Sequence, residues 1–248
     1  MLPKRLIDSM GGRFSAELGI DLSGADSGQI FRWFLASKLM GARIATKTAL
    51  ATYKEFERRG VTSPERIRST GWDGLVKNLY AGGYVRYDFS TATKLLSITD
   101  DLLRLYGGDL SVLHAESSDP RDLEERLKGL GKGIGDVTVN IFLRELRTVW
   151  NKARPALSPL VLLAAGHMNL LRPGEDPLPA LGRFWSRRKV KGRDFSDFEA
   201  ALLRLGKDYC RKRRCPACPM RDECTVRDNS APKQSKQGRR VRTRYSMK

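Results

Sequence analysis

The residues best suited to chemistry in this chain are four cysteines, all close together in its last quarter. They follow the pattern Cys-x4-Cys-x2-Cys-x5-Cys, formed by Cys210, Cys215, Cys218 and Cys224. A disulfide framework spreads its cysteines along the chain, whereas four clustered thiols are typical of a metal centre. Zn²⁺ and a [4Fe–4S] cluster both accept four thiolates, and the spacing leaves both open, because only Cys215-x2-Cys218 has the form of a zinc knuckle.

A glycine-rich segment is the second candidate site. It reads Gly129-Leu130-Gly131-Lys132-Gly133-Ile134-Gly135 and lies between two predicted helices. Glycines let the backbone turn tightly, and the turn points the free amides of the second helix outward, where they suit a phosphate oxygen. Such contacts hold a duplex without reading its sequence. We therefore predict that this hairpin binds DNA phosphates, through Gly129, Gly131, Lys132, Gly133 and Gly135; an ordinary helix–helix turn is the alternative.

The elements that must position these two sites are helices. Apolar residues recur at spacings of three and four, and stretches of strict alternation are absent, so we predict an all-α fold. Asp119-Pro120 is a strong helix start, with Asp as the cap and Pro in the first turn. Ser27 is expected to cap an earlier helix. The predicted helices cover residues 29–35, 47–59, 90–105, 119–128, 137–149, 157–171 and 197–205.

The charge of the chain indicates a polyanionic partner. It carries 46 Lys and Arg against 28 Asp and Glu, a net charge of +18. The segment 229–248 holds seven of these cations and no acid, and we expect it to be a disordered basic tail. Two further basic clusters, in 183–193 and 207–214, favour a nucleic-acid surface. No apolar run is long enough to span a membrane and no secretory signal is recognisable, so we expect a cytoplasmic protein, nucleoid-associated in a bacterium or archaeon.

The two motifs, in this order, resemble the endonuclease III superfamily of helix-hairpin-helix DNA glycosylases. A hairpin of the form L-x-G-[LVI]-G is followed about 80 residues later by a compact four-cysteine loop. The similarity covers roughly residues 28–226. It also rests on Phe31 to Ala51 (the family's first long helix), on Leu79 to Tyr84 with Ala92 to Leu96 (the helix entry of its barrel), and on Leu205 to Cys210 (the approach to its cluster).

The resemblance implies a two-domain fold with a cleft between the domains. One domain would be a helical barrel over 40–150, with the helix-hairpin-helix at about 119–147. The other would combine 1–39 with 151–228 and hold the cysteine loop. The resemblance also implies a [4Fe–4S] cluster on the four cysteines; zinc stays open because the first spacing is four residues where the family has six.

The chemical residues of that family are the part that this chain lacks. Gly133 stands where bifunctional members carry a nucleophilic lysine, and Lys132 is its neighbour. The position of the family's aspartate falls near Asn151, which can cap a helix but is no general base. Asp136 starts the second hairpin helix, where the dipole lowers its basicity. Lys132, Asp136 and Asn151 are thus the candidate catalytic residues, and Arg43 is the candidate to fill the gap left by an extruded base.

Three functions follow from these expectations. The first is a monomeric base-excision repair protein that recognises damaged bases in duplex DNA and cleaves the N-glycosidic bond as a monofunctional glycosylase, without Schiff-base lyase activity. The second is a non-catalytic DNA-binding protein that keeps the fold and the iron–sulfur cluster. The third is a zinc-stabilised DNA-binding regulator with an incidental hairpin.

Overall fold

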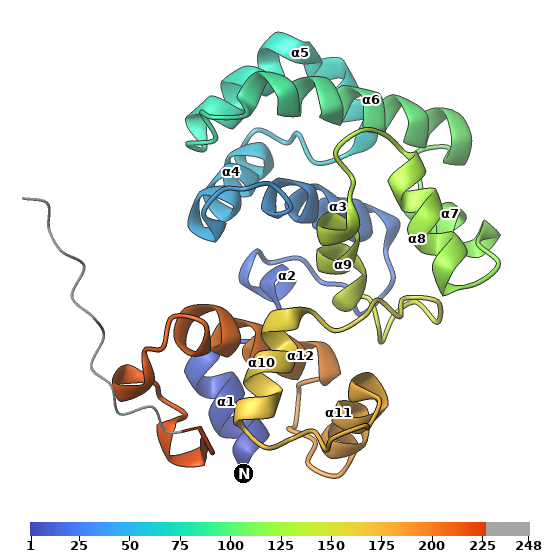
Figure 1. The fold of residues 1–248 in the computed structure, drawn as a ribbon. Helices are drawn as coiled ribbons and strands as arrows, with labels where there is room; N and C mark the ends of the chain where they lie inside the picture. The colour runs from blue at the N-terminus through green and yellow to red at the C-terminus, as the bar shows by residue number, and fades with distance from the viewer. Residues whose placement is uncertain (227–248) are drawn as a thin grey trace, which may run out of the picture.

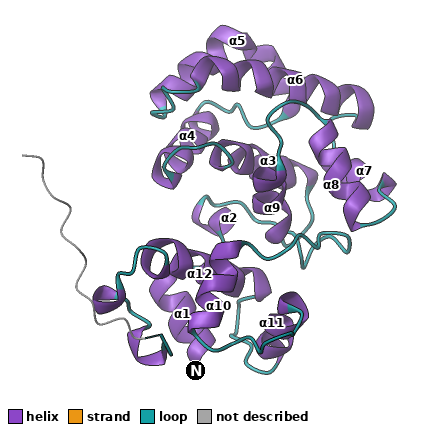
Figure 2. Ribbon diagram, viewed as in Figure 1, coloured by secondary structure: helices purple, strands orange, loops and turns teal. Residues whose placement is uncertain are grey.

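The computed structural model describes residues 1–226, and the regular secondary structure in that range consists of helices joined by loops (Figure 2). This confirms the predicted all-α class. The predicted basic tail, 229–248, lies outside the described residues. None of the helices in the described part is both long and apolar enough to cross a membrane.

The helices form two groups, one above the other in Figure 1. The upper group contains α3 to α9, and the lower group contains α1, α10, α11, α12 and the short cysteine-bearing turns η1 to η3. The short helix α2 (Phe14–Glu17) lies between them. The helices of the upper group are α3 Ser27–Met40, α4 Thr46–Arg58, α5 Pro64–Ala81, α6 Asp88–Tyr106, α7 Leu110–Glu116, α8 Pro120–Gly129 and α9 Asp136–Arg144. The helices and turns of the lower group are α1 Leu2–Met10, α10 Pro159–His167, α11 Pro177–Ser186, α12 Phe195–Leu205, η1 Gly206–Cys210, η2 Cys215–Ala217 and η3 Arg221–Glu223.

Helix α3 belongs to a different group from the one that the predicted domain division gives it. The sequence prediction assigned residues 1–39 to the cysteine-bearing domain. In the structure α3 packs against α4, α7 and α9, which are all members of the upper group. Helix α1, from the same predicted domain, packs against α12 of the lower group. The reason is that α3 is buried on most sides, and the helices able to cover it are those that follow it in the chain.

Side-chain caps fix several helix starts. Asp119 accepts hydrogen bonds from the amides of residues 121 and 122, as predicted. Asp26, not Ser27, caps α3 by accepting from the Gln29 amide at 2.9 Å. Ser158 caps α10. Helix α9 ends at Arg144, five residues earlier than predicted, because the next residue, Glu145, turns its carboxylate toward α2.

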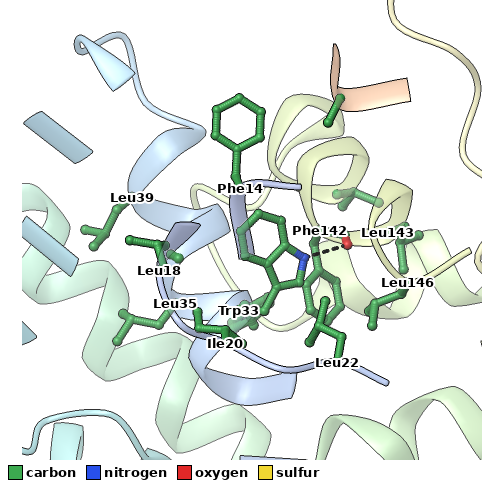
Figure 3. Packing of buried hydrophobic residues seen from close by; sticks show 14 of the residues in the cluster. Phe14, Leu18, Ile20, Leu22, Trp33, Leu35, Leu39, Phe142, Leu143 and Leu146 are labelled. Carbon is green, nitrogen blue, oxygen red and sulfur yellow. Dashed lines mark hydrogen bonds between the residues drawn. The ribbon is translucent and has the colours of Figure 1, made fainter. Parts of the chain in front are cut away.

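The core of the upper group is built around Trp33 (Figure 3). Its side chain is fully buried, and its indole N–H donates to the Phe142 carbonyl oxygen at 3.0 Å, so that α3 is joined to α9. The Phe142 ring packs edge-on against Phe34 at 5.3 Å. An indole N–H buried without an acceptor would be destabilising, so this bond fixes the register of the two helices. Helix α9, which follows the hairpin, therefore has a rigid support.

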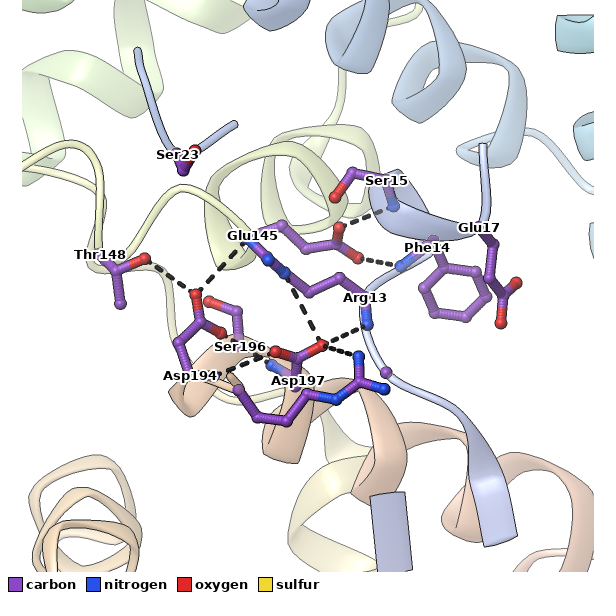
Figure 4. A network of polar contacts seen from close by, with 12 residues as sticks. Arg13, Phe14, Ser15, Glu17, Ser23, Glu145, Thr148, Asp194, Ser196 and Asp197 are labelled. Carbon is purple, nitrogen blue, oxygen red and sulfur yellow. Dashed lines mark hydrogen bonds and ion pairs between the residues drawn. The ribbon is translucent and has the colours of Figure 1, made fainter. Parts of the chain in front are cut away.

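A buried polar network joins the two groups (Figure 4). Glu145 is fully buried and accepts from the amides of Phe14 and Ser15, both at 2.9 Å. Asp197 in α12 is also buried and accepts from the Arg13 amide at 3.1 Å. Charged acceptors for otherwise unpaired amides make strong hydrogen bonds. The segment between α1 and α3 is thus held by carboxylates from both groups.

Candidate nucleic-acid interface and metal centre

The glycine-rich segment forms the connection between α8 and α9. Leu130 and Ile134 are buried and anchor it, while Lys132, Gly133 and Gly135 are exposed. Gly131 and Gly133 have φ of +149° and +93°, which side-chain-bearing residues rarely adopt. The predicted tight turn is therefore present at the predicted residues.

The amides of this loop are available to a ligand. Within the described residues, the amide nitrogens of Lys132, Gly133 and Gly135 make no hydrogen bond to the protein. Gly135 is the N-cap of α9 and offers no side chain to cap it, so the first-turn amides of that helix also lack side-chain partners. Backbone amides at a helix start attract anions. The loop thus has the chemistry of a phosphate-binding hairpin.

A cavity of about 270 Å³ lies beside the hairpin, between α3 and α6. Three cations line it, namely Lys38, Lys94 and Arg43, together with Gly133 of the loop. Arg43 is exposed in the turn after α3, whereas Lys38 is only 4 % exposed. Burial, and secondarily the charge of Lys94, lowers the pKa of Lys38 to about 8. Two predicted site residues, Gly133 of the hairpin and Arg43, therefore meet at one place.

Lys38 and Lys94 are members of this site that the sequence interpretation missed. Neither lysine is among the candidate residues named from the sequence. A usable signal was present, because Lys38 is the lone cation in the apolar stretch from Trp33 to Met40, whose residues are mostly buried. Lysine is rarely fully buried without a partner. Lys94 lies in α6, and only the three-dimensional structure brings it to the hairpin.

A larger groove of about 830 Å³ separates the upper and lower groups. Asp136 and Asn140 of α9 line it from above, and Ser158, Lys207 and Arg211 line it from below. Lys207 also belongs to one of the predicted basic clusters, and its ammonium donates to Thr46. Among the described residues that line the groove, Asp136 is the one carboxylate. The groove is therefore lined mainly by apolar side chains, and its three cations, Arg144, Lys207 and Arg211, outnumber this one acid.

The three candidate catalytic residues are not gathered into one constellation. Asp136 is exposed and its carboxylate forms an ion pair with Lys128 at 2.8 Å. Asn151 does not cap the helix after the hairpin; its side-chain oxygen lies 3.1 Å from the His114 ring nitrogen of α7. The cap of that helix is Ser158, which has no charge. Lys132 is exposed in the loop and has no ion-pair partner among the described residues.

The four cysteines line a single hollow at the end of the lower group, with Tyr209 and His167 beside them. Burial raises the pKa of Cys210 to about 12, and the charges of the other three thiols add to the effect. Burial also raises the pKa of Cys218. Four neighbouring thiolates repel one another, so a cationic centre is needed to keep all four cysteines deprotonated. No three His, Cys, Asp or Glu side chains in residues 1–226 converge closely enough to hold a single ion.

Packing fixes where the cysteine loop sits. Gly206 begins η1, and a Cβ there would come within 2.1 Å of the Leu160 carbonyl oxygen of α10, so only glycine permits this approach. The Thr225 amide donates to the His167 carbonyl at 2.8 Å. Met220 is fully buried under the loop. Arg5 of α1 donates to the Pro219 carbonyl at 3.1 Å. The loop is thus held by the first helix and by α10.

No protein-family model matches this chain, and no curated protein matches it. Its function is therefore inferred from the hairpin, the cavity, the groove and the cysteine loop.

Proposed function

We propose that this protein binds duplex DNA and acts on damaged bases, as a base-excision repair protein of the endonuclease III type that cleaves the N-glycosidic bond. The observation that carries the proposal is the hairpin loop, whose unpaired amides lie beside a cavity lined by three cations. Amides and cations share one preferred ligand, the phosphate group. The order of hairpin and cysteine loop along the chain agrees with the family resemblance.

The two groups of helices fit the two-domain fold that the resemblance implies. In this proposal the upper group, with α3 included, is the barrel domain, and the lower group is the cluster domain. DNA lies across the hairpin, and the nucleotide under examination enters the groove between the groups. Lys207 and Arg211 on the opposite wall of that groove add positive charge where a DNA backbone would pass.

We propose that Cys210, Cys215, Cys218 and Cys224 hold a [4Fe–4S] cluster. The donor set fits, because four thiols face one hollow, and the cations at positions 211–214 would offset the negative charge of a cluster bound by four thiolates. Such a cluster supplies one-electron redox chemistry and cross-links its loop. Zinc, which needs all four sulfurs around one ion, is the alternative. Iron and sulfide analysis with the visible absorption spectrum distinguishes the two.

The non-catalytic alternative is favoured by one observation. Helix α10, the next helix after α9, is capped by Ser158, and Asn151 pairs with His114, so neither position supplies the carboxylate of the resembling glycosylases. A protein with this site and no other reactive group would recognise DNA without excising a base.

The test combines binding with base release. Fluorescence anisotropy at low salt measures affinity for duplexes that carry uracil, hypoxanthine, an oxidised base or an alkylated base, and chromatography measures the free base. We expect binding to every duplex and release from at least one. Lys132→Ala should weaken binding to all sequences alike and lower the salt slope by about 1. Binding without release supports the non-catalytic protein, and absence of binding refutes the proposal.

A further inference from the structure

The feature that the proposed function leaves unused is the buried amine of Lys38. Its side chain is 4 % exposed, and within the described residues its Nζ has no hydrogen-bond or ion-pair partner. An ammonium ion buried without an anion is disfavoured, so burial lowers the pKa of this amine to about 8 and makes a fraction of the neutral form available near neutral pH. A neutral lysine amine is a nucleophile.

The hairpin makes room for this amine. A Cβ built on Gly133 would lie 3.5 Å from Lys38 Nζ and 2.9 Å from Lys94 Cδ. Any side chain at position 133 would therefore compete with these two lysines for the same space. Lys38, from a different helix, brings its amine to the position that a side chain on the loop would occupy.

The cavity connects the amine to the surface at the hairpin. Arg43, Ser90 and Gly133 line the cavity with Lys38, and all three are exposed. A sugar whose phosphate is bound by the loop amides of Lys132 and Gly133 would lie next to this opening. The amine is thus shielded from bulk water by α3 and α6 and faces the place where DNA is proposed to bind.

We propose that Lys38 is a catalytic nucleophile that attacks C1′ of an abasic 2-deoxyribose, which gives the protein a DNA lyase activity. This inference rests on the proposed function, because it requires a duplex on the hairpin. It replaces the sequence-based expectation of a reaction without a Schiff base, which considered only Gly133 and its neighbour Lys132 as places for the nucleophile.

The chemistry balances without any cofactor. The lone pair of Lys38 Nζ attacks the C1′ aldehyde of the abasic site, an N–C1′ bond forms, and the C1′ oxygen, with one proton taken up from solvent, leaves as water to give a protonated imine. Loss of the C2′ proton to water then drives cleavage of the C3′–O bond, and the 3′ phosphate departs with the electron pair. Hydrolysis of the imine by water restores the lysine and releases an unsaturated aldehyde on the other strand end.

The neighbours of Lys38 set the pH at which it reacts. The titratable groups that line the cavity with it are Lys94 of α6, Tyr87 at the start of α6, and Arg43; the hairpin contributes only Gly133. No carboxylate is among them. The charge of Lys94 lowers the pKa of Lys38, so removing that charge should raise it.

Borohydride trapping on a duplex with one abasic site tests the inference. Borohydride reduces the imine to a stable protein–DNA adduct, and peptide mapping identifies the residue. We expect the adduct on Lys38, with its yield reduced more than about 100-fold in both Lys38→Met and Lys38→Arg. Lys77→Met, an exposed lysine of α5, is the matched control and should trap normally. The rate of trapping should rise through about pH 8, and Lys94→Met should move this midpoint to higher pH.

The outcomes separate the two proposals. An adduct on Lys132 or another amine overturns the role of Lys38, and so does tight binding of the abasic duplex with no adduct; both leave the proposed function standing. Retained trapping in Lys38→Arg would show that only the positive charge matters, as for a phosphate contact, and also overturns the inference. Absence of duplex binding refutes both proposals together.

Discussion

Replacing Lys38 with methionine should make the protein more stable, by an amount that depends on pH. The pKa of Lys38 falls from 10.5 to about 8 on folding. Below about pH 8 the lysine is charged in both states, so the folded state bears the full penalty of the buried charge. Between about pH 8 and 10.5 the folded protein has released the proton that the unfolded chain retains, and the stability of the wild type rises with pH. The methionine variant lacks this penalty at every pH.

The magnitude follows from the two pKa values. Linkage gives a penalty of about 3 kcal/mol at pH 6.5 and about 1.4 kcal/mol at pH 9.5. The side chain is almost fully buried, so solvent screening reduces this little. Any difference in packing between lysine and methionine adds the same amount at both pH values. The change between them, about 2 kcal/mol, is therefore the diagnostic quantity.

This change is measured by urea unfolding at the two pH values. The proteins compared are the wild type, Lys38→Met and Lys77→Met. We expect the advantage of Lys38→Met over the wild type to shrink by about 2 kcal/mol from pH 6.5 to 9.5. Lys77 is exposed, and its replacement should show no comparable pH dependence. A constant difference between Lys38→Met and the wild type would refute the reasoning, since it would mean that the amine keeps its ordinary pKa in the folded protein.

Four other perturbations test the remaining features. Gly133→Ala, at φ +93° and 2.9 Å from a lysine stem, should lose about 1–2 kcal/mol of stability and bind duplex less tightly, whereas Gly166→Ala, in α10 with open space around its Cβ, should lower neither in thermal melts and anisotropy. Glu145→Ala leaves two buried amides unpaired and should lose about 3–5 kcal/mol in urea unfolding; a loss under about 1 kcal/mol contradicts the network. Cys215→Ala should lower bound iron per chain and the visible absorbance, and unchanged iron would exclude the cysteine as a ligand. Deleting 229–248 removes seven cations and should flatten the salt dependence of duplex affinity; an unchanged slope means that this segment does not meet phosphates.

The sequence predicted those features that depend on local chain geometry. The cap at Asp119, the turn at Gly131 and Gly133 and the all-α class follow from local preferences, and the structure agrees with them. The early end of α9 could not be read locally, because Glu145 leaves the helix to bind amides 130 residues away in the chain.

The candidate site was predictable only in part, for the same reason. The hairpin and the cysteines are contiguous motifs, whereas the cavity beside the hairpin combines Lys38, Lys94 and Gly133 from three separate elements. Ser158-Pro159 is a helix start of the same kind as Asp119-Pro120, so the cap of α10 was readable from the sequence, although the predicted helix began one residue earlier, at 157. A fixed offset from the hairpin pointed to Asn151, which lies against α7 instead.

The contact between the first helix and the cysteine loop has a consequence for biosynthesis. Helix α1 packs on α12, and Arg5 reaches Pro219 and Asp222, so the lower group is assembled from segments that lie far apart in the sequence. The upper group is one continuous stretch and can fold while synthesis continues, since its contacts are closer in sequence. Helix α1 can pack against α12 and the cysteine loop only after these segments, up to the last cysteine, have been translated. Under the proposed cluster assignment, loading of the cluster would follow the synthesis of Cys224 and would stabilise the loop that Arg5 contacts.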